Sequence, residues 1–240
     1  MTSRKLRFAI FGNTYQPKKS ASITKILACL SERHAEVCIE KEFYDFLVHG
    51  NQLNVTADTV FEGSDFEADF VISMGGDGTF LRAASMVGDK QIPILGVNMG
   101  RLGFLADIGT GEIEHIVESI YEGDYTIETR AAIAVETDGT PLKGYHCALN
   151  DVAILKRDNA SMISIRATIN GDYLTTYQAD GLVVSTPTGS TAYSLSVGGP
   201  IIVPGTSVFS MTAVAPHSLN IRPIVIPDSA EICLTVESRF

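Results

Sequence analysis

The residues whose types and spacing point most directly to chemistry are Gly75-Gly76-Asp77-Gly78-Thr79. They follow an apolar run at residues 70–72, which predicts a buried strand, and they open residues 79–87, which predict a short helix. Glycines at such a junction let a ligand approach the main chain, and the free N–H groups of a first helical turn attract phosphates. A carboxylate in a phosphate cradle suits a group that holds a metal ion or takes a proton from an attacking hydroxyl. The alternative interpretation is a turn whose glycines serve steric needs alone.

A second glycine-rich loop, at residues 96–105, follows the next expected strand, at residues 92–97. Asn98 offers both a donor and an acceptor to a sugar or a base. Phe104 can stack on a flat ring, but its apolar neighbours favour packing in the core. Arg101 is able to meet a phosphate, although a solvated surface arginine is the simpler interpretation.

Two polar clusters interrupt the apolar runs of the second half. Asn150 and Asp151 stand between apolar neighbours, where polar side chains cost free energy unless they are paired. They form either a turn between two strands or a pair of hydrogen-bonding groups that face a ribose diol. The denser cluster covers residues 180–200, where an expected strand at 182–184 leads into a loop rich in Ser, Thr and Gly. A short helix expected near Ser190 then brings hydroxyls, backbone N–H groups and the Tyr193 ring to one concave site, unless the hydroxyls only shape the loop. The lone His217 beside a proline favours a structural role.

The elements that must position these residues change character along the chain. In the first half, expected strands at residues 6–11, 36–39, 70–73 and 92–97 alternate with expected helices at 22–30, 79–87 and 110–121, the last capped by Thr110. This alternation predicts a doubly wound, Rossmann-like α/β domain with a parallel sheet, whose ligands bind at the carboxyl ends of the strands. After residue 124 the pattern becomes mostly antiparallel β, a sandwich or layered sheets. The expected strands there cover residues 127–135, 145–149, 152–155, 163–169, 173–177, 182–184 and 209–214. We therefore expect an α/β domain at residues 1–124 and a β-rich domain at residues 125–240.

Composition narrows the classes of partner. The chain has 240 residues, 45% hydrophobic and 19% charged, with a formal net charge of −10. That charge argues against general binding to nucleic acid or to a membrane surface. No apolar run approaches the roughly 20 residues of a membrane span, and the start reads as too short for a secretory signal, so a cytoplasmic location is expected. The four cysteines form no C-x-x-C pair and the five histidines are scattered, which indicates neither a disulfide framework nor a zinc site.

These motifs, with Pro216-His217-Ser218-Leu219 and Arg222-Pro223, resemble the NAD kinase family in content and order from about residue 70 to residue 227. The first motif alone is shared with diacylglycerol and sphingosine kinases and with phosphofructokinases. The block at residues 186–200 is far more specific to the family. The resemblance implies an α/β domain before a β-rich domain in a homodimer or homotetramer. It also implies a phosphotransferase with an alcohol acceptor, moving the γ-phosphoryl group of ATP to the 2′-hydroxyl of the adenosine ribose of NAD, to give NADP. Mg²⁺ or another divalent cation would be carried by ATP, and no metal ligand is expected in the chain.

The resemblance also assigns roles to residues. Asp77 would accept the proton of the 2′-hydroxyl, and Gly75, Gly76 and Thr79 would form the phosphate loop. The residues assigned to binding the dinucleotide are Asp77, Gly78, Asn98, Phe104, Asn150, Asp151, Ser161, Gln178, Asp180, Thr188, Thr191, Ala192, Tyr193, Ser194, Leu195, Ser196 and Ala215.

The sequence departs from the family pattern at three places. Asp151 stands where the family often has the longer Glu, and Gln178 stands where a basic residue is common. The sequence stops at Phe240, whereas the family usually continues into a segment that folds back and adds a contact, so that segment is expected to be missing. Two alternatives stay open: a lipid or sugar kinase of the same superfamily, and a non-catalytic sensor of NAD or NADP. ATP or polyphosphate as donor, NAD or NADH as acceptor, and feedback by NADP also stay open.

Overall fold

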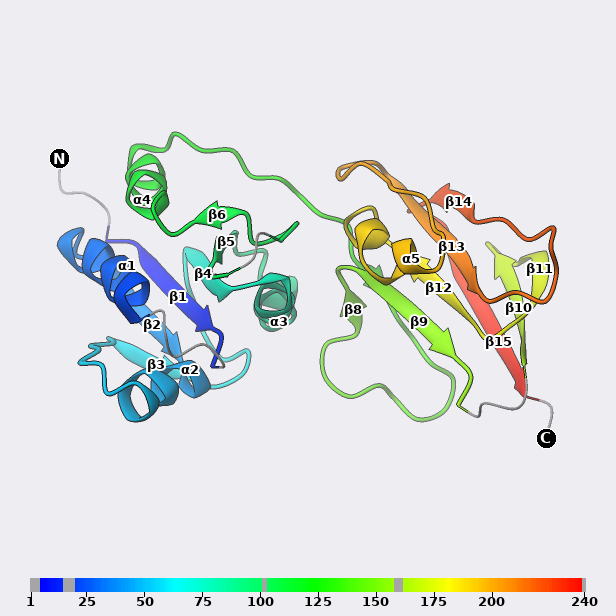
Figure 1. The fold of residues 1–240 in the computed structure, drawn as a ribbon, viewed down its shortest axis with the longest axis horizontal. Coiled ribbons are helices and arrows are strands. Elements are labelled where there is room, and N and C mark those ends of the chain that lie inside the picture. Colours follow the sequence, from blue (N-terminus) through cyan, green and yellow to red (C-terminus); the bar gives the residue numbers. More distant parts are fainter. Residues whose placement is uncertain (1–4, 15–19, 101–102, 158–161, 239–240) are drawn as a thin grey trace. The chain divides into compact units, whose positions relative to one another are not determined.

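A computed structural model describes residues 5–14, 20–100, 103–157 and 162–238 (Figure 1). The chain divides into two compact units, Met1–Ile127 and Glu128–Phe240. Each unit has its own apolar core, so each is described by itself. Within the described residues, no helix has the length and apolar character needed to cross a bilayer.

The N-terminal unit is built on a six-stranded sheet in which every neighbouring pair is parallel. The strand order is β3-β2-β1-β4-β5-β6. The strands are β1 (Arg7–Gly12), β2 (Glu36–Glu40), β3 (Thr59–Phe61), β4 (Phe70–Gly75), β5 (Ile94–Asn98) and β6 (Ile108–Gly109). The central strands β1 and β4 are almost wholly buried, as expected for apolar runs covered on both faces. The predicted α/β domain is therefore confirmed.

Helices cover both faces of this sheet. Along β1, Phe8 and Ile10 belong to the core formed with α1 (Ser20–Glu32) and α4 (Ile113–Glu122). Ala9 and Phe11 belong to the opposite core, formed with α3 (Asp77–Val87). Alternate residues of one strand thus face different helix layers, because successive strand side chains point to opposite sides. This is the doubly wound arrangement predicted from the sequence.

The strand order reverses between β1 and β4, which lie side by side. The loop after β1 and the loop after β4 leave the sheet at the same edge, and the N–H of Asn13 donates to the carbonyl of Met74 across 3.0 Å. In open α/β sheets, ligands bind in the crevice at such a reversal. The Gly75-Gly76-Asp77 turn occupies this point.

Some boundaries differ from the prediction. Helix α4 begins at Ile113 after Glu112, so Thr110 is not its N-cap. The Glu112 carboxylate accepts instead from the N–H of Gly109 at 2.7 Å, which closes the turn ahead of the helix. Residues 41–61, which carried no predicted element, contain α2 (Lys41–Asp45), the π-helix η2 (Phe46–Gly50) and β3. A 3-10 turn, η3 (Gly88–Lys90), follows α3.

The C-terminal unit packs two antiparallel sheets around one core. Their orders are β11-β10-β15 and β14-β13-β12-β9, and a small pair joins β7 and β8. The strands are β7 (Ile133–Ala134), β8 (Cys147–Ala148), β9 (Asp151–Leu155), β10 (Ile163–Ile169), β11 (Asp172–Ala179), β12 (Gly181–Ser185), β13 (Val208–Val214), β14 (Ile224–Pro227) and β15 (Ile232–Ser238). The predicted β-rich domain is confirmed, although the expected strand at residues 127–135 is reduced to β7.

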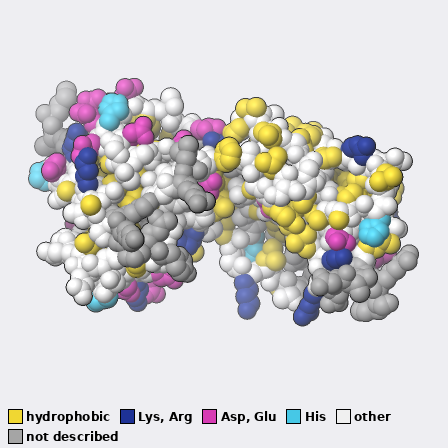
Figure 2. All heavy atoms as spheres, viewed as in Figure 1, with side chains coloured by type: hydrophobic (Ala, Val, Ile, Leu, Met, Phe, Trp, Pro, Cys, Tyr) yellow, Lys and Arg dark blue, Asp and Glu magenta, His cyan; other side chains and the backbone are white. Residues whose placement is uncertain are grey.

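The surface of the C-terminal unit carries exposed apolar side chains. Figure 2 shows hydrophobic side chains gathered on its viewed face. Among the described residues of this unit, the large apolar side chains that are more than half exposed are Leu155, Tyr173, Ile201, Val203 and Leu219. An exposed apolar surface of this kind is typical of sites that meet another molecule.

Candidate active site

Asp77 is the first residue of α3, at the carboxyl end of β4. Its carboxylate accepts three backbone hydrogen bonds. One oxygen accepts from the N–H groups of Leu105 and Ala106, each at 3.0 Å, and the other accepts from the N–H of Phe104 at 3.0 Å. The carboxylate therefore ties the loop before β6 to the start of α3, and we call this arrangement the Asp77 clamp.

The Asp77 clamp also sets the charge state of the carboxyl group. Burial raises the pKa of Asp77, but the N–H groups of Ala106, Leu105 and Phe104 together lower that pKa below its ordinary value. Asp77 is thus ionised at neutral pH. A Cβ atom on Gly103 would lie 2.1 Å from a carboxylate oxygen of Asp77, so the loop approaches this closely only because residue 103 is glycine.

The clamp turns the Phe104 side chain outward. Phe104 is 74% exposed, so the expectation that it packs in the core is wrong. Its backbone is held by Asp77, and the side chain is left in solvent at the carboxyl edge of the sheet. An exposed aromatic ring in this place suits stacking on a flat ligand ring.

Asn98 organises the same loop from its other end. Its side-chain N–H donates to the carbonyl of Ala106 at 3.0 Å, and its side-chain oxygen accepts from the N–H of Gly100 at 2.6 Å. Both ends of the amide are thus engaged within the loop. Asn98 therefore helps to hold Ala106, whose N–H is one of the donors of the Asp77 clamp.

The phosphate-loop glycines have different roles. A Cβ on Gly75 would lie 2.1 Å from the Thr79 hydroxyl oxygen, which is a steric requirement. A Cβ on Gly76 or Gly78 would meet nothing within 4 Å, so at these positions the main chain lies open to a ligand. The steric interpretation therefore explains Gly75, and the ligand-approach interpretation suits Gly76 and Gly78.

In the C-terminal unit, Asn150 and Asp151 lie at the carboxyl end of β12, where Ser185 pairs with Asp151. The Asn150 carbonyl accepts from the N–H of Thr186 at 2.9 Å, and a Cβ on Gly189 would lie 2.0 Å from that carbonyl oxygen. The side-chain oxygen of Asn150 is buried and finds no hydrogen-bond partner among the described residues. Burial raises the pKa of Asp151, and the N–H of Tyr193 opposes that rise.

Much of the hydroxyl-rich block serves its own loop. The Thr186 hydroxyl donates to Leu149 at 2.6 Å and accepts from the N–H of Gly189 at 3.0 Å. The Ser190 hydroxyl donates to Pro187 at 2.7 Å and accepts from the N–H of Ile202 at 3.0 Å. The loop-shaping interpretation therefore accounts for these two hydroxyls, neither of which was assigned to ligand binding.

The assigned residues of this block surround that rigid loop. Thr188 and Thr191 lie in the 3-10 turn η4 (Thr188–Thr191), and Tyr193 to Ser196 form the short helix α5 (Tyr193–Ser196). Tyr193, Leu195 and Ser196 are exposed, whereas Ser194 is buried with a hydroxyl that has no partner among the described residues. Arg130, which sequence reasoning missed, donates to the Thr188 hydroxyl at 3.4 Å. No motif in the sequence around Arg130 marks it.

Asn150 and Asp151, at one end of β12, form what we call the Asn150 group. A second set of assigned residues, Gln178, Asp180 and Ala215, lies at the other end of β12, and we call it the Asp180 group. The Asp180 carboxylate forms an ion pair with Lys156 at 2.8 Å, and its N–H donates to Val214 at 2.9 Å. The carbonyl of Gln178 accepts from the N–H of His217 at 2.9 Å, and Ala215 has a left-handed φ of 44°. Since β12 spans five residues, this group stands about 17 Å from the Asn150 group. Lys156 had no sequence signal either.

The comparisons with known proteins cover both units. The family model described as "ATP-NAD kinase N-terminal domain" matches residues 8–125, and "ATP-NAD kinase C-terminal domain" matches residues 149–240. The chain belongs to the NAD kinase family. It is 58% identical to an NAD kinase from Bacteroides fragilis over 98% of this chain and 81% of that one. It is 47% identical to an NAD kinase from Porphyromonas gingivalis over 97% of this chain and 80% of that one.

Solved structures of the NAD kinase family have the same fold. An NAD kinase from Archaeoglobus fulgidus in complex with ATP has a TM-score of 0.74 at 27% identity, covering 97% of this chain and 81% of that one. Yeast NADH kinase complexed with NADH has a TM-score of 0.85 at 24% identity, covering 100% of this chain and 70% of that one. The resemblance predicted from the motifs is therefore confirmed.

Two residues named in the sequence analysis are not described by the structure. Ser161 and Arg101 lie outside the described residues. The described part of the chain holds no group of three or more His, Cys, Asp or Glu side chains able to bind a metal ion. The four cysteines have free thiols, and of these Cys38 is buried.

Proposed function

We propose that this chain is an ATP-dependent NAD kinase, which transfers the γ-phosphoryl group of ATP to the 2′-hydroxyl of the adenosine ribose of NAD and releases NADP. The observation that carries the proposal is the ionised Asp77 carboxylate at the open Gly76 and Gly78 backbone, at the strand reversal of the sheet. The names of the Bacteroides and Porphyromonas relatives support it, as does the ATP complex of the Archaeoglobus enzyme.

In this proposal Asp77 accepts the proton of the 2′-hydroxyl. Its low pKa makes it a weak base. Such a base suits a loose phosphoryl-transfer transition state, in which the hydroxyl loses its proton late. The open backbone at Gly76 and Gly78 receives phosphate oxygens, with Gly75 and Thr79 shaping the turn. Mg²⁺ or another divalent cation enters with ATP and neutralises its phosphates.

The proposal assigns dinucleotide-binding residues in each unit. Phe104 and Tyr193 are exposed aromatic rings that suit stacking on a base or nicotinamide ring. The buried oxygen of Asn150 and the desolvated carboxyl of Asp151 suit ribose hydroxyls, because each gains hydrogen bonds it otherwise lacks. We assign the remaining contacts to Gly78, Asn98, Ser161, Gln178, Asp180, Thr188, Thr191, Ala192, Ser194, Leu195, Ser196 and Ala215.

We also propose that the active form is a homodimer or homotetramer. The Asp180 group and the Asn150 group lie at opposite ends of β12, about 17 Å apart along the strand, so a neighbouring copy is a natural source of one of them. The exposed apolar residues of the C-terminal unit support such an association. Free thiols and the net charge of −10 fit a cytoplasmic enzyme that binds no nucleic acid and no membrane.

The deciding experiment incubates the protein with ATP, Mg²⁺ and NAD and detects NADP with an NADP-specific dehydrogenase. We expect NADP to form with ATP, and parallel reactions with polyphosphate as donor and NADH as acceptor define the substrates. Calorimetry that shows NAD binding without any NADP would contradict the proposal and favour a dinucleotide sensor. Phosphorylation of a lipid or sugar in place of NAD would favour another kinase of the superfamily.

A further inference from the structure

Arg82 lies on α3, about one and a half helical turns after Asp77. Its guanidinium reaches across the end of the sheet to three partners. It contacts the Glu40 carboxylate at 3.2 Å and the Glu42 carboxylate at 3.1 Å, and it donates to the Gly12 carbonyl at 3.0 Å. One side chain thus joins the helix that carries the phosphate loop to two other strands.

Two partners of Arg82 are the last residues of strands, and the third, Glu42, lies in α2. Gly12 ends β1 and Glu40 ends β2, on the far side of the strand reversal from β4. Glu40 is only 7% exposed and also accepts from the N–H of Phe43 at 3.1 Å, where it caps α2. A Cβ on Gly12 would lie 2.1 Å from the Phe43 ring, so this end of β1 has little room to move. Arg82 therefore joins both walls of the crevice at the reversal.

The charges argue that Arg82 does not itself hold a phosphate. Its guanidinium already faces two carboxylates and a carbonyl, so it has no unpaired charge to offer an anion. The planar, five-donor guanidinium instead suits several fixed acceptors at once. Its role is to hold other groups in place.

We propose that Arg82 is a positioning residue for the phosphoryl donor: it fixes the start of α3 against the carboxyl ends of β1 and β2, so that the backbone of residues 76–79 is set before ATP arrives. The expected effect on kcat/KM rests on the proposed function. The expected effects on ATP binding and on amide hydrogen exchange do not. Misplacement of a binding loop by about 1 Å costs on the order of 10²-fold in rate.

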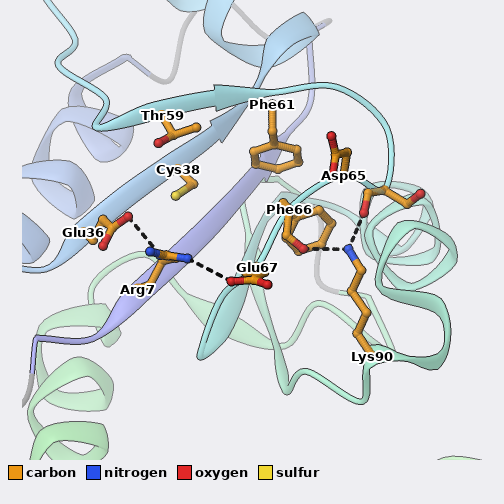
Figure 3. A pocket seen from close by; sticks show the side chains of 10 residues that line it. Arg7, Glu36, Cys38, Thr59, Phe61, Asp65, Phe66, Glu67 and Lys90 are labelled. Atoms are coloured by element: carbon orange, nitrogen blue, oxygen red, sulfur yellow. Dashed lines mark hydrogen bonds and ion pairs between the residues drawn. The ribbon is translucent and has the colours of Figure 1, made fainter.

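The chain offers a matched control in Arg7. Arg7 begins β1 and pairs with Glu36 of β2 at 2.9 Å and with Glu67 at 3.5 Å (Figure 3). The Arg7 side chain is 38% exposed and that of Arg82 is 32% exposed, so both link β1 to β2 from similar environments. Arg7 lies at the amino ends of the strands, beside a cavity of about 510 Å³ whose other cation, Lys90, bonds the carbonyls of Ser64 and Phe66. Loss of its ion pair should not reach the phosphate loop.

The experiment compares Arg82→Met, Arg82→Lys and Arg7→Met with the wild-type protein. We expect Arg82→Met to weaken ATP binding in calorimetry and to lower kcat/KM for ATP about ten- to a hundredfold, with KM for NAD changed less than about threefold. Arg82→Lys should recover only part of the loss, because an ammonium cannot face all three partners. Amide hydrogen exchange at residues 75–82 should rise in Arg82→Met and stay at the wild-type rate in Arg7→Met.

The outcomes separate this inference from the proposed function. If the wild-type protein binds ATP but makes no NADP, the proposed function fails. The ATP-binding and hydrogen-exchange data still test whether Arg82 positions the phosphate loop. Wild-type ATP affinity together with wild-type exchange in Arg82→Met would overturn the inference. Equal losses in Arg82→Met and Arg7→Met would overturn it too, since they would show a general effect on stability.

Discussion

Replacement of Asp77 by Asn tests two roles of one carboxylate. The Asp77 clamp has three donors, and an amide offers them only one oxygen, while its NH₂ group must face at least one backbone N–H. A backbone N–H left without an acceptor lowers the free energy of unfolding by about 1–3 kcal/mol. Each remaining hydrogen bond contributes about 1 kcal/mol less, because its acceptor is then neutral instead of charged. Because the site is partly exposed, we expect a total loss of about 2–4 kcal/mol, or a fall in Tm of roughly 6–12 °C for a unit of this size.

The clamp also predicts how this loss depends on pH. The folded-state pKa of Asp77 is lowered, so its stabilising contribution is fully present above the ordinary value of about 3.9. That contribution disappears as the pH falls through the lowered folded value. The Tm difference between the wild-type protein and Asp77→Asn should thus be constant from neutral pH down to about pH 4 and shrink below it.

Turnover should fall more than the clamp alone explains. Loss of a general base costs about 10²–10⁴-fold in rate. Gly103→Ala crowds the same carboxylate yet keeps it ionisable, so it should lose Tm but retain more turnover than Asp77→Asn. Asp58→Asn, which removes a carboxylate that accepts from the N–H of Val37 at 2.8 Å, controls for any backbone-bonded aspartate. Retention of most turnover in a destabilised Asp77→Asn would refute the base role, and an unchanged Tm would refute the clamp.

Three further substitutions test the site and its surroundings. Phe104→Ala should raise KM for NAD about tenfold by loss of stacking and leave Tm unchanged, because the ring is 74% exposed; an unchanged KM in steady-state assays would count against stacking. Asp151→Asn should raise KM for NAD but also raise Tm: burial raises the folded pKa above its ordinary value, so the ionised carboxyl costs stability as the pH rises from about 3.9 through the folded value, and the gain in thermal melts should grow over that interval and then level off. Tyr177→Phe should stabilise the C-terminal unit by about 1 kcal/mol in urea titrations, because the buried hydroxyl has no hydrogen-bond partner among the described residues. A destabilised Tyr177→Phe would reveal a partner for that hydroxyl.

The sequence predicted most of the long elements, because their signals are local, but the seven-residue strand β15 carried no prediction. Strands β1 and β4 are apolar runs covered on both faces, and α1 has a clear helical period. The edge strands β3 and β6 were missed because they have only three and two residues, too few for a period to register. The strand expected at residues 127–135 shrank to β7 because propensity alone does not supply a pairing partner.

The site was predicted in its residue types and less well in its contacts. The glycines and the carboxylate at residue 77 marked the strand end correctly, but the Asp77 clamp joins residues 27 to 29 positions apart through a loop whose path no local pattern gives. The same clamp explains why Phe104 is exposed despite apolar neighbours. Arg82 and Lys156 are ordinary charges on a helix and beside a strand, and only the packed structure shows what they touch.

The position of the two polar groups at opposite ends of β12 has a consequence for genetics. If neighbouring copies each supply one end of a shared site, a lesion at Asp180 and a lesion at Asn150 damage different halves of it. Two inactive alleles, one with each lesion, would then assemble mixed oligomers that contain one doubly damaged site and one intact site. A cell that carries both alleles would then regain part of the activity that is lost when either allele is present alone.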